Sequence, residues 1–305
     1  MATQSIRGDA RPLQVMWGIA RDSFFAWIKH NASSLGAALA FYTLFSIAPI
    51  LVIAMAVAGS VFGPNAAETR VLDEMRGLLG DAGAQAVQGL LASAHQSGLK
   101  GFAAAIGIVT LLVGATSVFG ELQNTLDYIW KSPKKSSVVW WRILRSRILS
   151  VGLILGVGFL LMVSLVVSAA LAALGAWFGS FLVQWRVILP ALDLILSLGL
   201  TTVLFAMIYK YVPRENIAWG DVWVGGLVTA CLFTVGKQLI GLYLGRSSLS
   251  SAYGAAGSIM VLLLWIYYSA QVFLLGAEFT HVFTYALGSR SQRRGGPVRR
   301  KHPAA

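Results

Sequence analysis

Cysteine is almost absent from this chain of 305 residues, which has only Cys231, in an apolar run. A single cysteine excludes an intramolecular disulfide. No CxxC motif occurs, and the four histidines are scattered along the chain at His30, His95, His281 and His302. Metal sites need several ligands brought close together. We therefore expect neither a metal ion nor another cofactor.

Charged residues are also few. They make up 12% of the chain, whereas soluble domains contain about 25%, and 57% of the residues are hydrophobic. This composition excludes an ordinary soluble domain and indicates an integral membrane protein. Proline is scarce as well, with eight residues against 32 glycines. Small residues such as glycine let membrane helices approach one another closely.

Acidic residues are outnumbered by basic ones, 12 to 24, which gives a net charge of +12. A strongly basic protein can bind the phosphates of nucleic acid. Membrane proteins, however, collect Lys and Arg in their cytoplasmic segments. The distribution of the basic residues decides between these interpretations, and it favours the second, with no nucleic-acid partner.

Six apolar stretches are long enough to cross a hydrocarbon core of about 30 Å at about 1.5 Å per residue. The sequence thus predicts an all-α integral membrane protein, a six-transmembrane-helix bundle with spans at 35–62, 101–119, 148–178, 188–209, 222–244 and 256–285. The second span has a polar continuation through Glu121, Asn124 and Asp127.

The orientation follows from the Lys and Arg residues between the spans. Four precede the first span, six lie between the second and third, two between the fourth and fifth, and six in the tail. The opposite side has five, and the remaining one, Lys237, lies inside the fifth span. Because the excess of positive charge stays in the cytoplasm, both termini are predicted to be cytoplasmic.

Three segments lie outside the predicted bundle. Residues 1–34 form a cytoplasmic segment in which Arg11–Lys29 has the apolar spacing of an amphipathic helix at the membrane surface. The external loop 63–99 has the spacing of one or two short amphipathic helices, which either cap the bundle or cover a ligand. The tail 286–305 is rich in Arg, Gly and Pro and is predicted to be disordered.

Lys237 is the most unusual residue of the spans. A charge inside an apolar run is costly and usually has a partner or a task. Asp193 in the fourth span lies at a matching depth below the outer surface. We predict an Asp193–Lys237 ion pair between neighbouring helices, which either serves packing alone or gates an anionic ligand.

Other polar residues within the spans predict a cavity. Pro49 interrupts the first span and removes a backbone donor, and Tyr42 and Ser46 lie one turn apart on one face. The alternative is a structural kink whose hydroxyl groups bond to the backbone. Glu121 and Glu278 both fall near the cytoplasmic side, where they either bind a cation or proton or anchor the helices in headgroup water.

The complete set of candidate cavity or substrate residues is Tyr42, Ser46, Pro49, Glu121, Asn124, Lys237, Gln238, Gln271 and Glu278. His281 follows Glu278 by three residues and shares its helix face. Without further ligands in view, an interfacial hydrogen-bonded pair is favoured over a metal site.

Four stretches of this chain resemble the YihY/BrkB family of bacterial inner-membrane proteins. They are 37–49 (AALAFYTLFSIAP), 122–130 (LQNTLDYIW), 209–213 (YKYVP) and the segment from Tyr253-Gly254 to Leu275-Gly276-Ala277-Glu278. The resemblance extends from about Trp17 to Tyr285. It implies a six-helix bundle in the inner membrane, and it implies a transporter, because some members are linked to export of envelope lipid or solute.

Members of this family are also described as virulence or serum-resistance factors and are often labelled ribonuclease BN. The nuclease that properly has this name is a metallo-hydrolase with a His-x-His-x-Asp-His cluster, which this sequence lacks. We therefore expect no enzyme but a transporter or flippase-like protein for an envelope lipid, an amphipathic molecule or an anionic solute. The alternative is a membrane scaffold or envelope assembly factor. Membrane lipids are the expected partners, and no oligomeric state is predicted.

Overall fold

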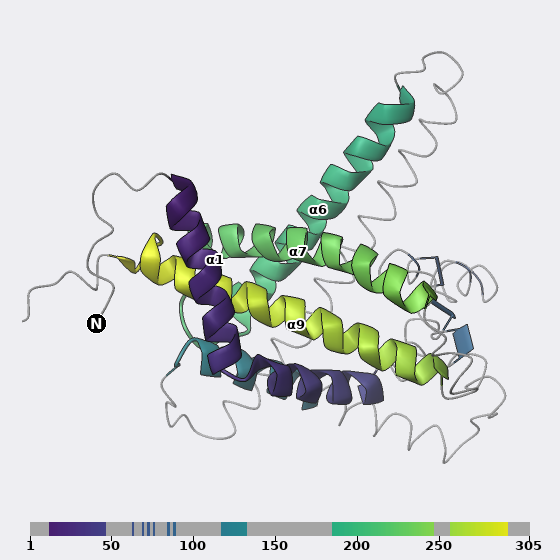
Figure 1. Ribbon diagram of the computed structural model, residues 1–305, viewed down its shortest axis with the longest axis horizontal. Coiled ribbons are helices and arrows are strands. Elements are labelled where there is room, and N and C mark those ends of the chain that lie inside the picture. Colours follow the sequence, from purple (N-terminus) through teal and green to yellow (C-terminus); the bar gives the residue numbers. More distant parts are fainter. Residues whose placement is uncertain are drawn as a thin grey trace, which may run out of the picture.

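The computed structural model describes residues 12–46, 117–132, 185–246 and 257–291, together with isolated residues between 63 and 89. In these ranges every regular element is a helix, and the long helices pack side by side (Figure 1). The predicted first and second spans are described only in part, by the helix Ala32–Ser46 and by a helix at 117–129. The third span, most of the loop 63–99 and the tail beyond residue 291 lie outside the described residues.

Three described helices are long and apolar enough to cross a membrane. They are α6 (Trp185–Tyr211), α7 (Trp219–Arg246) and α9 (Gly257–Ala286). Their bounds lie within three residues of the predicted spans 188–209, 222–244 and 256–285. These three predictions are confirmed as helices, because the length of an apolar run is a local property that needs no knowledge of the neighbours.

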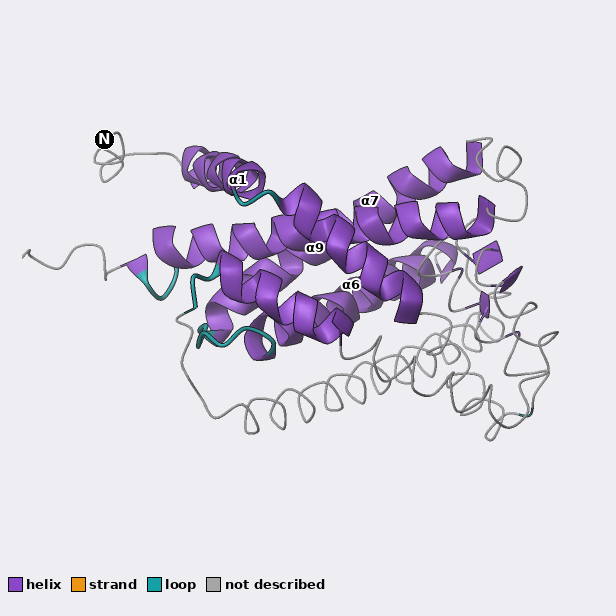
Figure 2. Ribbon diagram, turned by 90° about the horizontal axis from the view of Figure 1, so that it is seen from below, coloured by secondary structure: helices purple, strands orange, loops and turns teal. Residues whose placement is uncertain are grey.

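The first helix, α1 (Pro12–Lys29), lies across α9 instead of along it. Figure 1 shows α1 crossing α9, and Figure 2, turned by 90°, shows α1 nearly end-on while α9 still runs lengthwise. Several large apolar side chains of α1 are exposed, among them Trp17, Phe25 and Ile28. The helix that the sequence predicts here is therefore present, and its position at the membrane interface stays a prediction.

A sharp turn at residues 30–31, here called the elbow, separates α1 from the helix Ala32–Ser46. Asn31 has a left-handed backbone with φ of 53°, which asparagine tolerates better than most residues. Its carbonyl oxygen accepts the amide of Ser34 at 3.0 Å and so begins the second helix. The elbow therefore fixes the direction in which the chain passes from α1 into the helix Ala32–Ser46.

The antiparallel helices α7 and α9 meet through the same short pattern, Gly-x-x-x-Thr. Gly225 of α7 faces Thr280 of α9, and Gly276 of α9 faces Thr229 of α7. Each threonine hydroxyl donates to the carbonyl of the glycine four residues earlier, at 2.7 Å in both helices. The hydroxyls are thus satisfied within their own helix, and the glycines leave the space that the opposite threonine fills.

The neighbouring glycine of α7 faces α6. A Cβ on Gly226 would lie 2.9 Å from the carbonyl oxygen of Thr202 and 3.0 Å from the amide nitrogen of Ala206. Consecutive residues of a helix are about 100° apart, so Gly225-Gly226 lets α7 approach two helices at once. By contrast, a Cβ on Gly241 of α7 would have nothing within 4 Å.

The junction of the three spans is closed by Tyr209 of α6, which is fully buried. Its hydroxyl donates to the carbonyl oxygen of Phe273 in α9 at 2.8 Å and lies 3.1 Å from the hydroxyl of Thr229 in α7. Because the polar tip is satisfied, this large side chain can fill the centre of the bundle at no desolvation cost.

Candidate functional site at the elbow

A titratable pair joins the elbow to α9. His30 Nδ1 lies 2.6 Å from Glu278 Oε1, and the Glu278 side chain is fully buried while that of His30 is 14% exposed. Glu278 lies eight residues before the end of α9, about 12 Å at 1.5 Å per residue. An ionisable side chain at such a position is costly unless it is paired, which is what His30 provides.

Aromatic rings surround this pair. The ring of Tyr128 meets the His30 ring edge-on at 5.4 Å, and Trp130 meets His281 in the same way at 5.1 Å. These contacts come from the helix 117–129 and the two residues after it, so three segments distant in sequence converge here. Trp130 and Glu278 are both almost fully buried, and low exposure of this kind strengthens the attraction between charged groups.

The second oxygen of Glu278 and the indole nitrogen of Trp130 are buried and have no hydrogen-bond partner among the described residues. Lys131 contributes positive charge close to the carboxylate. Buried polar atoms are nearly always bonded, and those that are not often mark a functional position. This cluster, called the elbow site below, can therefore hold and release a proton or a cation at Glu278.

A second polar cluster, the polar clasp, ties the helix ends beside the elbow site. It consists of the pairs Asp127–Arg214, Glu215–Arg290 and Asp221–Ser289. Asp127 accepts the backbone amide of Arg214 at 2.8 Å and pairs with its side chain at 3.2 Å. The helix 117–129 is thereby fixed to the connection between α6 and α7.

Arg290 follows the end of α9 and reaches back to that same connection. It pairs with Glu215 at 2.9 Å and donates to the Tyr285 hydroxyl at 3.0 Å. Burial alone would lower the pKa of Arg290, but the hydrogen bonds with Glu215 and Tyr285 outweigh it and raise that pKa. The guanidinium group therefore stays charged and holds the clasp closed.

Replacing Asp221 with alanine should destabilise the clasp. Both carboxylate oxygens accept the backbone amide of Ser289 at 3.2 Å, and one accepts its hydroxyl at 2.6 Å. Hydrogen bonds to a charged group contribute about 1.5–3 kcal/mol, so we expect the free energy of unfolding in detergent to fall by about that amount. Asp22→Ala, on the exposed face of α1, is the control. If Asp221→Ala and Asp22→Ala lowered the free energy of unfolding equally, the hydrogen bonds between Asp221 and Ser289 would be contradicted.

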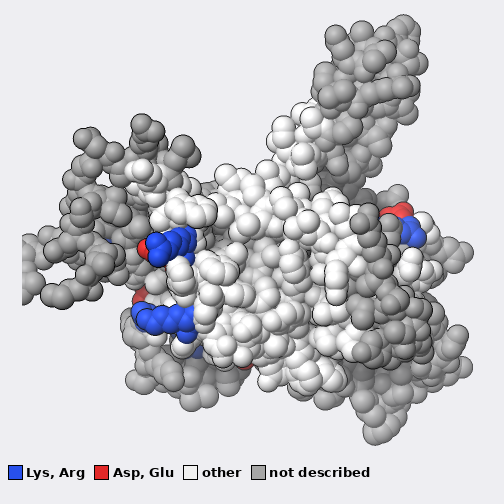
Figure 3. Space-filling view, in the orientation of Figure 1, with Lys and Arg blue, Asp and Glu red and all other residues white. Residues whose placement is uncertain are grey.

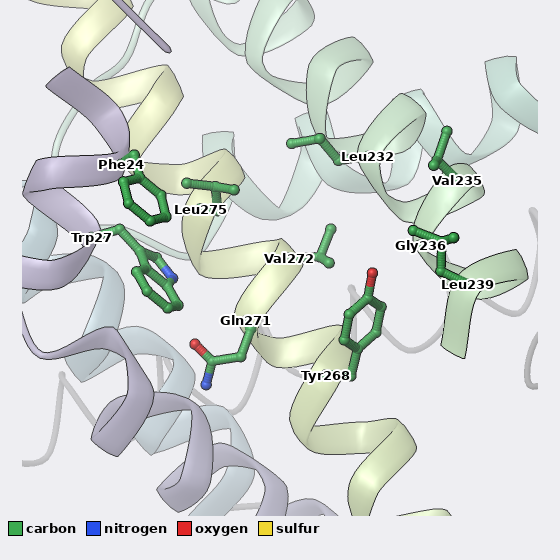
Figure 4. A pocket seen from close by; sticks show the side chains of 10 residues that line it. All are labelled: Phe24, Trp27, Leu232, Val235, Gly236, Leu239, Tyr268, Gln271, Val272 and Leu275. Atoms are coloured by element: carbon green, nitrogen blue, oxygen red, sulfur yellow. The ribbon is translucent and has the colours of Figure 1, made fainter. Parts of the chain in front are cut away.

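A groove opens beside the elbow site, between α1, α7 and α9 (Figure 4). It has a volume of about 310 Å³ and is called the lateral groove below. Its lining includes Phe24 and Trp27 of α1, Leu232 and Leu239 of α7, and Gln271 and Leu275 of α9. The lining is almost entirely apolar, as expected of a site that opens toward lipid.

Comparison with known proteins decides the family. A family model described as "Virulence factor BrkB" matches residues 24–302, nearly the whole chain. The chain belongs to the BrkB family. The resemblance seen in the sequence is thus confirmed.

Relatives of this BrkB-family chain are described as UPF0761 membrane proteins. One from Psychromonas ingrahamii is 28% identical over 265 residues, which cover 84% of this chain and 85% of the relative. One from Vibrio vulnificus is 27% identical over 293 residues, covering 93% and 87%. One from Ralstonia nicotianae is 32% identical over 200 residues, covering 65% and 43%. No solved structure matches.

These descriptions and the three apolar helices confirm the membrane protein that the composition predicts. Several residues of the predicted cavity lie apart in the BrkB-family chain. Ser46 donates to the carbonyl oxygen of Tyr42 at 3.1 Å, which agrees with the structural alternative for that hydroxyl. Tyr42, Asn124 and Gln238 are exposed. Pro49 lies outside the described residues.

Glu121 and Glu278 differ in their surroundings. Glu121 is half-buried on the helix 117–129 and bonds with no described residue, whereas Glu278 pairs with His30. Gln271 lines the lateral groove and donates to the carbonyl oxygen of Ser33 at 3.4 Å. Of the candidate residues, Glu278 and Gln271 therefore lie at the sites described above.

The predicted ion pair between Asp193 and Lys237 stays a prediction. Asp193 belongs to α6, but its side chain lies outside the described residues. Lys237 belongs to α7 and is half-buried. Figure 1 shows the first half of α6 diverging from α7.

Sequence reasoning missed His30. It identified His281 as the neighbour of Glu278, yet the ring of His281 packs on Trp130 and on Tyr285 at 4.9 Å. One feature of the sequence could have indicated His30, namely its position between an amphipathic segment and an apolar run. A polar residue at such a boundary lies where the chain turns, and a turn brings it against another helix.

Proposed function

We propose that this chain is an inner-membrane transporter or flippase-like protein for an envelope lipid, another amphipathic molecule or an anionic solute. The observation that carries the proposal is Glu278, fully buried within an apolar helix and paired with His30. Ionisable residues inside membrane helices are rare, and they mark substrate pathways and proton relays. The lateral groove beside the pair supplies an apolar surface for such a substrate.

The pair also links two elements that are far apart in the sequence. His30 belongs to the elbow, so its bond with Glu278 holds α1 and the helix Ala32–Ser46 against α9. Protonation of Glu278, or a cation bound to it, weakens this bond and releases the elbow. A carrier needs two arrangements of its helices around one site, and this bond favours one of them.

The proposed topology has both termini in the cytoplasm of a bacterial cell. It is supported by the described Lys and Arg residues, which gather where α9 ends and α7 begins (Figure 3). Lys210 in the last turn of α6, Arg214 and Arg290 all lie at this end. At the opposite end Arg76 is paired with Asp73 at 2.7 Å. This asymmetry is the one that the positive-inside rule describes.

In this proposal the chain is not an enzyme and has no nucleic-acid partner. Two of the basic residues at the proposed cytoplasmic end are already engaged, Arg214 with Asp127 and Arg290 with Glu215. A phosphate backbone would have to compete with these carboxylates. Membrane lipids are the proposed partners instead.

Reconstitution tests the proposal. In vesicles that contain a fluorescent phospholipid, in diacyl form or in single-chain form, the wild-type protein should accelerate the movement of at least one of them between leaflets, as followed by chemical quenching from outside. Glu278→Gln should slow this movement about tenfold or more, equivalent to about 1.4 kcal/mol on the barrier. Glu121→Gln, a half-buried acid with no described partner, should not.

One outcome would favour the scaffold instead. If the wild-type protein moves neither lipid nor anionic solute, and Glu278→Gln has no effect on cells, the proposed transport function is wrong. The close Gly-x-x-x-Thr packing of α7 and α9 is the observation that favours a rigid scaffold. In that case exchanging Asp193 and Lys237 for one another should preserve function, because the pair would serve helix register only.

A further inference from the structure

We infer that the lateral groove binds the acyl chain of a single-chain membrane lipid that carries a free hydroxyl next to its ester group, as a lysophospholipid does. This inference deepens the proposed function by naming the class of substrate. Binding itself does not require transport, so the two can be tested separately.

The direction of the groove suits an acyl chain. Along α7 it extends from Leu232 to Leu239, and along α9 from Leu275 to Tyr268. Each distance is seven residues, about 10 Å along the helix axis. Because α7 and α9 run along the predicted membrane normal, a chain in this groove lies parallel to the chains of the surrounding lipid.

α1 closes one end of the groove with Phe24 and Trp27. This helix crosses α9 and presents apolar side chains outward, as an interfacial helix does (Figure 1). The end beside α1 is therefore the end where the polar part of a lipid lies. The other side of the groove is open at Val235 and Leu239, which are 61% and 59% exposed, so a lipid enters from the bilayer.

The volume selects one chain over two. About 310 Å³ is at the lower limit of ligand pockets, which range from about 300 to about 1,000 Å³. Gly236 forms part of the wall, and a Cβ there would lie 2.6 Å from the Tyr268 hydroxyl. The helices are already in close contact behind the groove and leave no room for a second chain.

Two polar atoms in the groove lining specify the group next to the chain. Trp27 Nε1 is a donor and Gln271 Oε1 an acceptor, and both are buried without a partner among the described residues. In Figure 4 the indole nitrogen and the amide oxygen lie on the same side of the groove, between α1 and α9. The amide nitrogen of Gln271 is already committed to Ser33.

This donor and acceptor are complementary to an ester next to a hydroxyl. The ester carbonyl accepts from Trp27 Nε1, and the hydroxyl donates to Gln271 Oε1. A diacyl lipid has its second ester where the hydroxyl would be, so Gln271 Oε1 stays unsatisfied and only one of the two chains fits inside the groove. A site that is built for a hydroxyl discriminates strongly against a ligand without one.

The first experiment measures binding to the purified full-length protein in detergent. Lysophosphatidylglycerol and diacyl phosphatidylglycerol with the same headgroup and acyl chain are compared by native mass spectrometry. We expect the single-chain lipid to bind at least tenfold more tightly. Leu239→Trp fills the groove and should abolish this binding. Leu242→Trp is the matched control, on the same helix, outside the groove and 57% exposed against 59%.

The second experiment tests the polar atoms. Trp27→Phe removes the indole donor but keeps an aromatic ring, and it should weaken binding about three- to tenfold, as the loss of one hydrogen bond does. Trp265→Phe removes another buried indole donor without a described partner, outside the groove, and should leave affinity unchanged. A free fatty acid of the same chain length, which has no glycerol hydroxyl, should bind more weakly than the lysolipid.

Three results would overturn the inference: diacyl lipid binding as tightly as lysolipid, unchanged binding in Leu239→Trp, or equal effects of Trp27→Phe and Trp265→Phe. These results leave transport untouched. If vesicle transport depends on Glu278 while Leu239→Trp binds lysolipid normally, the proposed function stands and this inference fails. If lysolipid binds as expected but nothing is transported, the inference stands and the proposed function fails.

Discussion

Gly276→Ala is expected to disrupt the packing of α7 against α9, although alanine is the better helix former. A Cβ at position 276 overlaps the hydroxyl of Thr229 and lies 2.7 Å from that of Tyr209. Both hydroxyls are buried and hydrogen-bonded, so neither can move away cheaply. Overpacking of this kind costs about 1–3 kcal/mol or more, which should appear as a lower midpoint of unfolding in detergent.

The control is Gly241→Ala in α7, where nothing lies within 4 Å of the added Cβ. There the higher helix propensity of alanine should act alone and stabilise the helix by up to about 1 kcal/mol. Gly276→Ala combined with Thr229→Ala should recover part of the loss, because the nearest overlapping atom is removed. If Gly276→Ala and Gly241→Ala change stability equally, and the double variant recovers none of the loss, the close contact between Gly276 and Thr229 is not formed.

His30→Ala is expected to have the second large effect. It leaves the buried carboxylate of Glu278 without its partner, and breaking a buried pair from one side costs about 3–5 kcal/mol. Adding Glu278→Gln should restore part of this stability, since the uncompensated charge is then gone. Both variants can be compared with wild type by chemical unfolding in the same detergent.

His281→Ala is the informative comparison, because the sequence favoured His281 as the neighbour of Glu278. It removes ring contacts with Trp130 and Tyr285, about 0.5–1.5 kcal/mol for each aromatic pair, but leaves Glu278 paired with His30. If His281→Ala proves as costly as His30→Ala, or if Glu278→Gln fails to rescue His30→Ala, the elbow pair is wrongly assigned.

The three long helices were predictable because hydropathy is read along the chain. α9 starts and ends within one residue of the predicted span 256–285. A helix also occurs at the predicted amphipathic segment Arg11–Lys29, where structure gives Pro12–Lys29. In each case the pattern within one segment is sufficient, because a membrane or its surface is the same solvent wherever the segment meets it.

Contacts between helices were not predictable in the same way. Gly241 and Gly225 both have a small residue four positions further on, yet only Gly225 meets another helix closely. Which face of a helix is covered depends on its rotation about its own axis, and that rotation is set by all its neighbours together. Small-residue spacing indicates that a close contact is possible but does not say where it forms.

The sequence by itself determined that this is a helical membrane protein of the BrkB family. The length of the apolar runs, the scarcity of charge and the residue patterns of the family can all be identified without knowing which helices are in contact. Only the tertiary structure decided that Glu278 pairs with His30, 248 positions away. Sequence spacing predicts side-chain contacts only between residues about one helical turn apart. This pair instead depends on the turn at Asn31 and on the crossing of α1 over α9. The same crossing creates the lateral groove, so the candidate substrate site also belongs to the fold and not to any one segment.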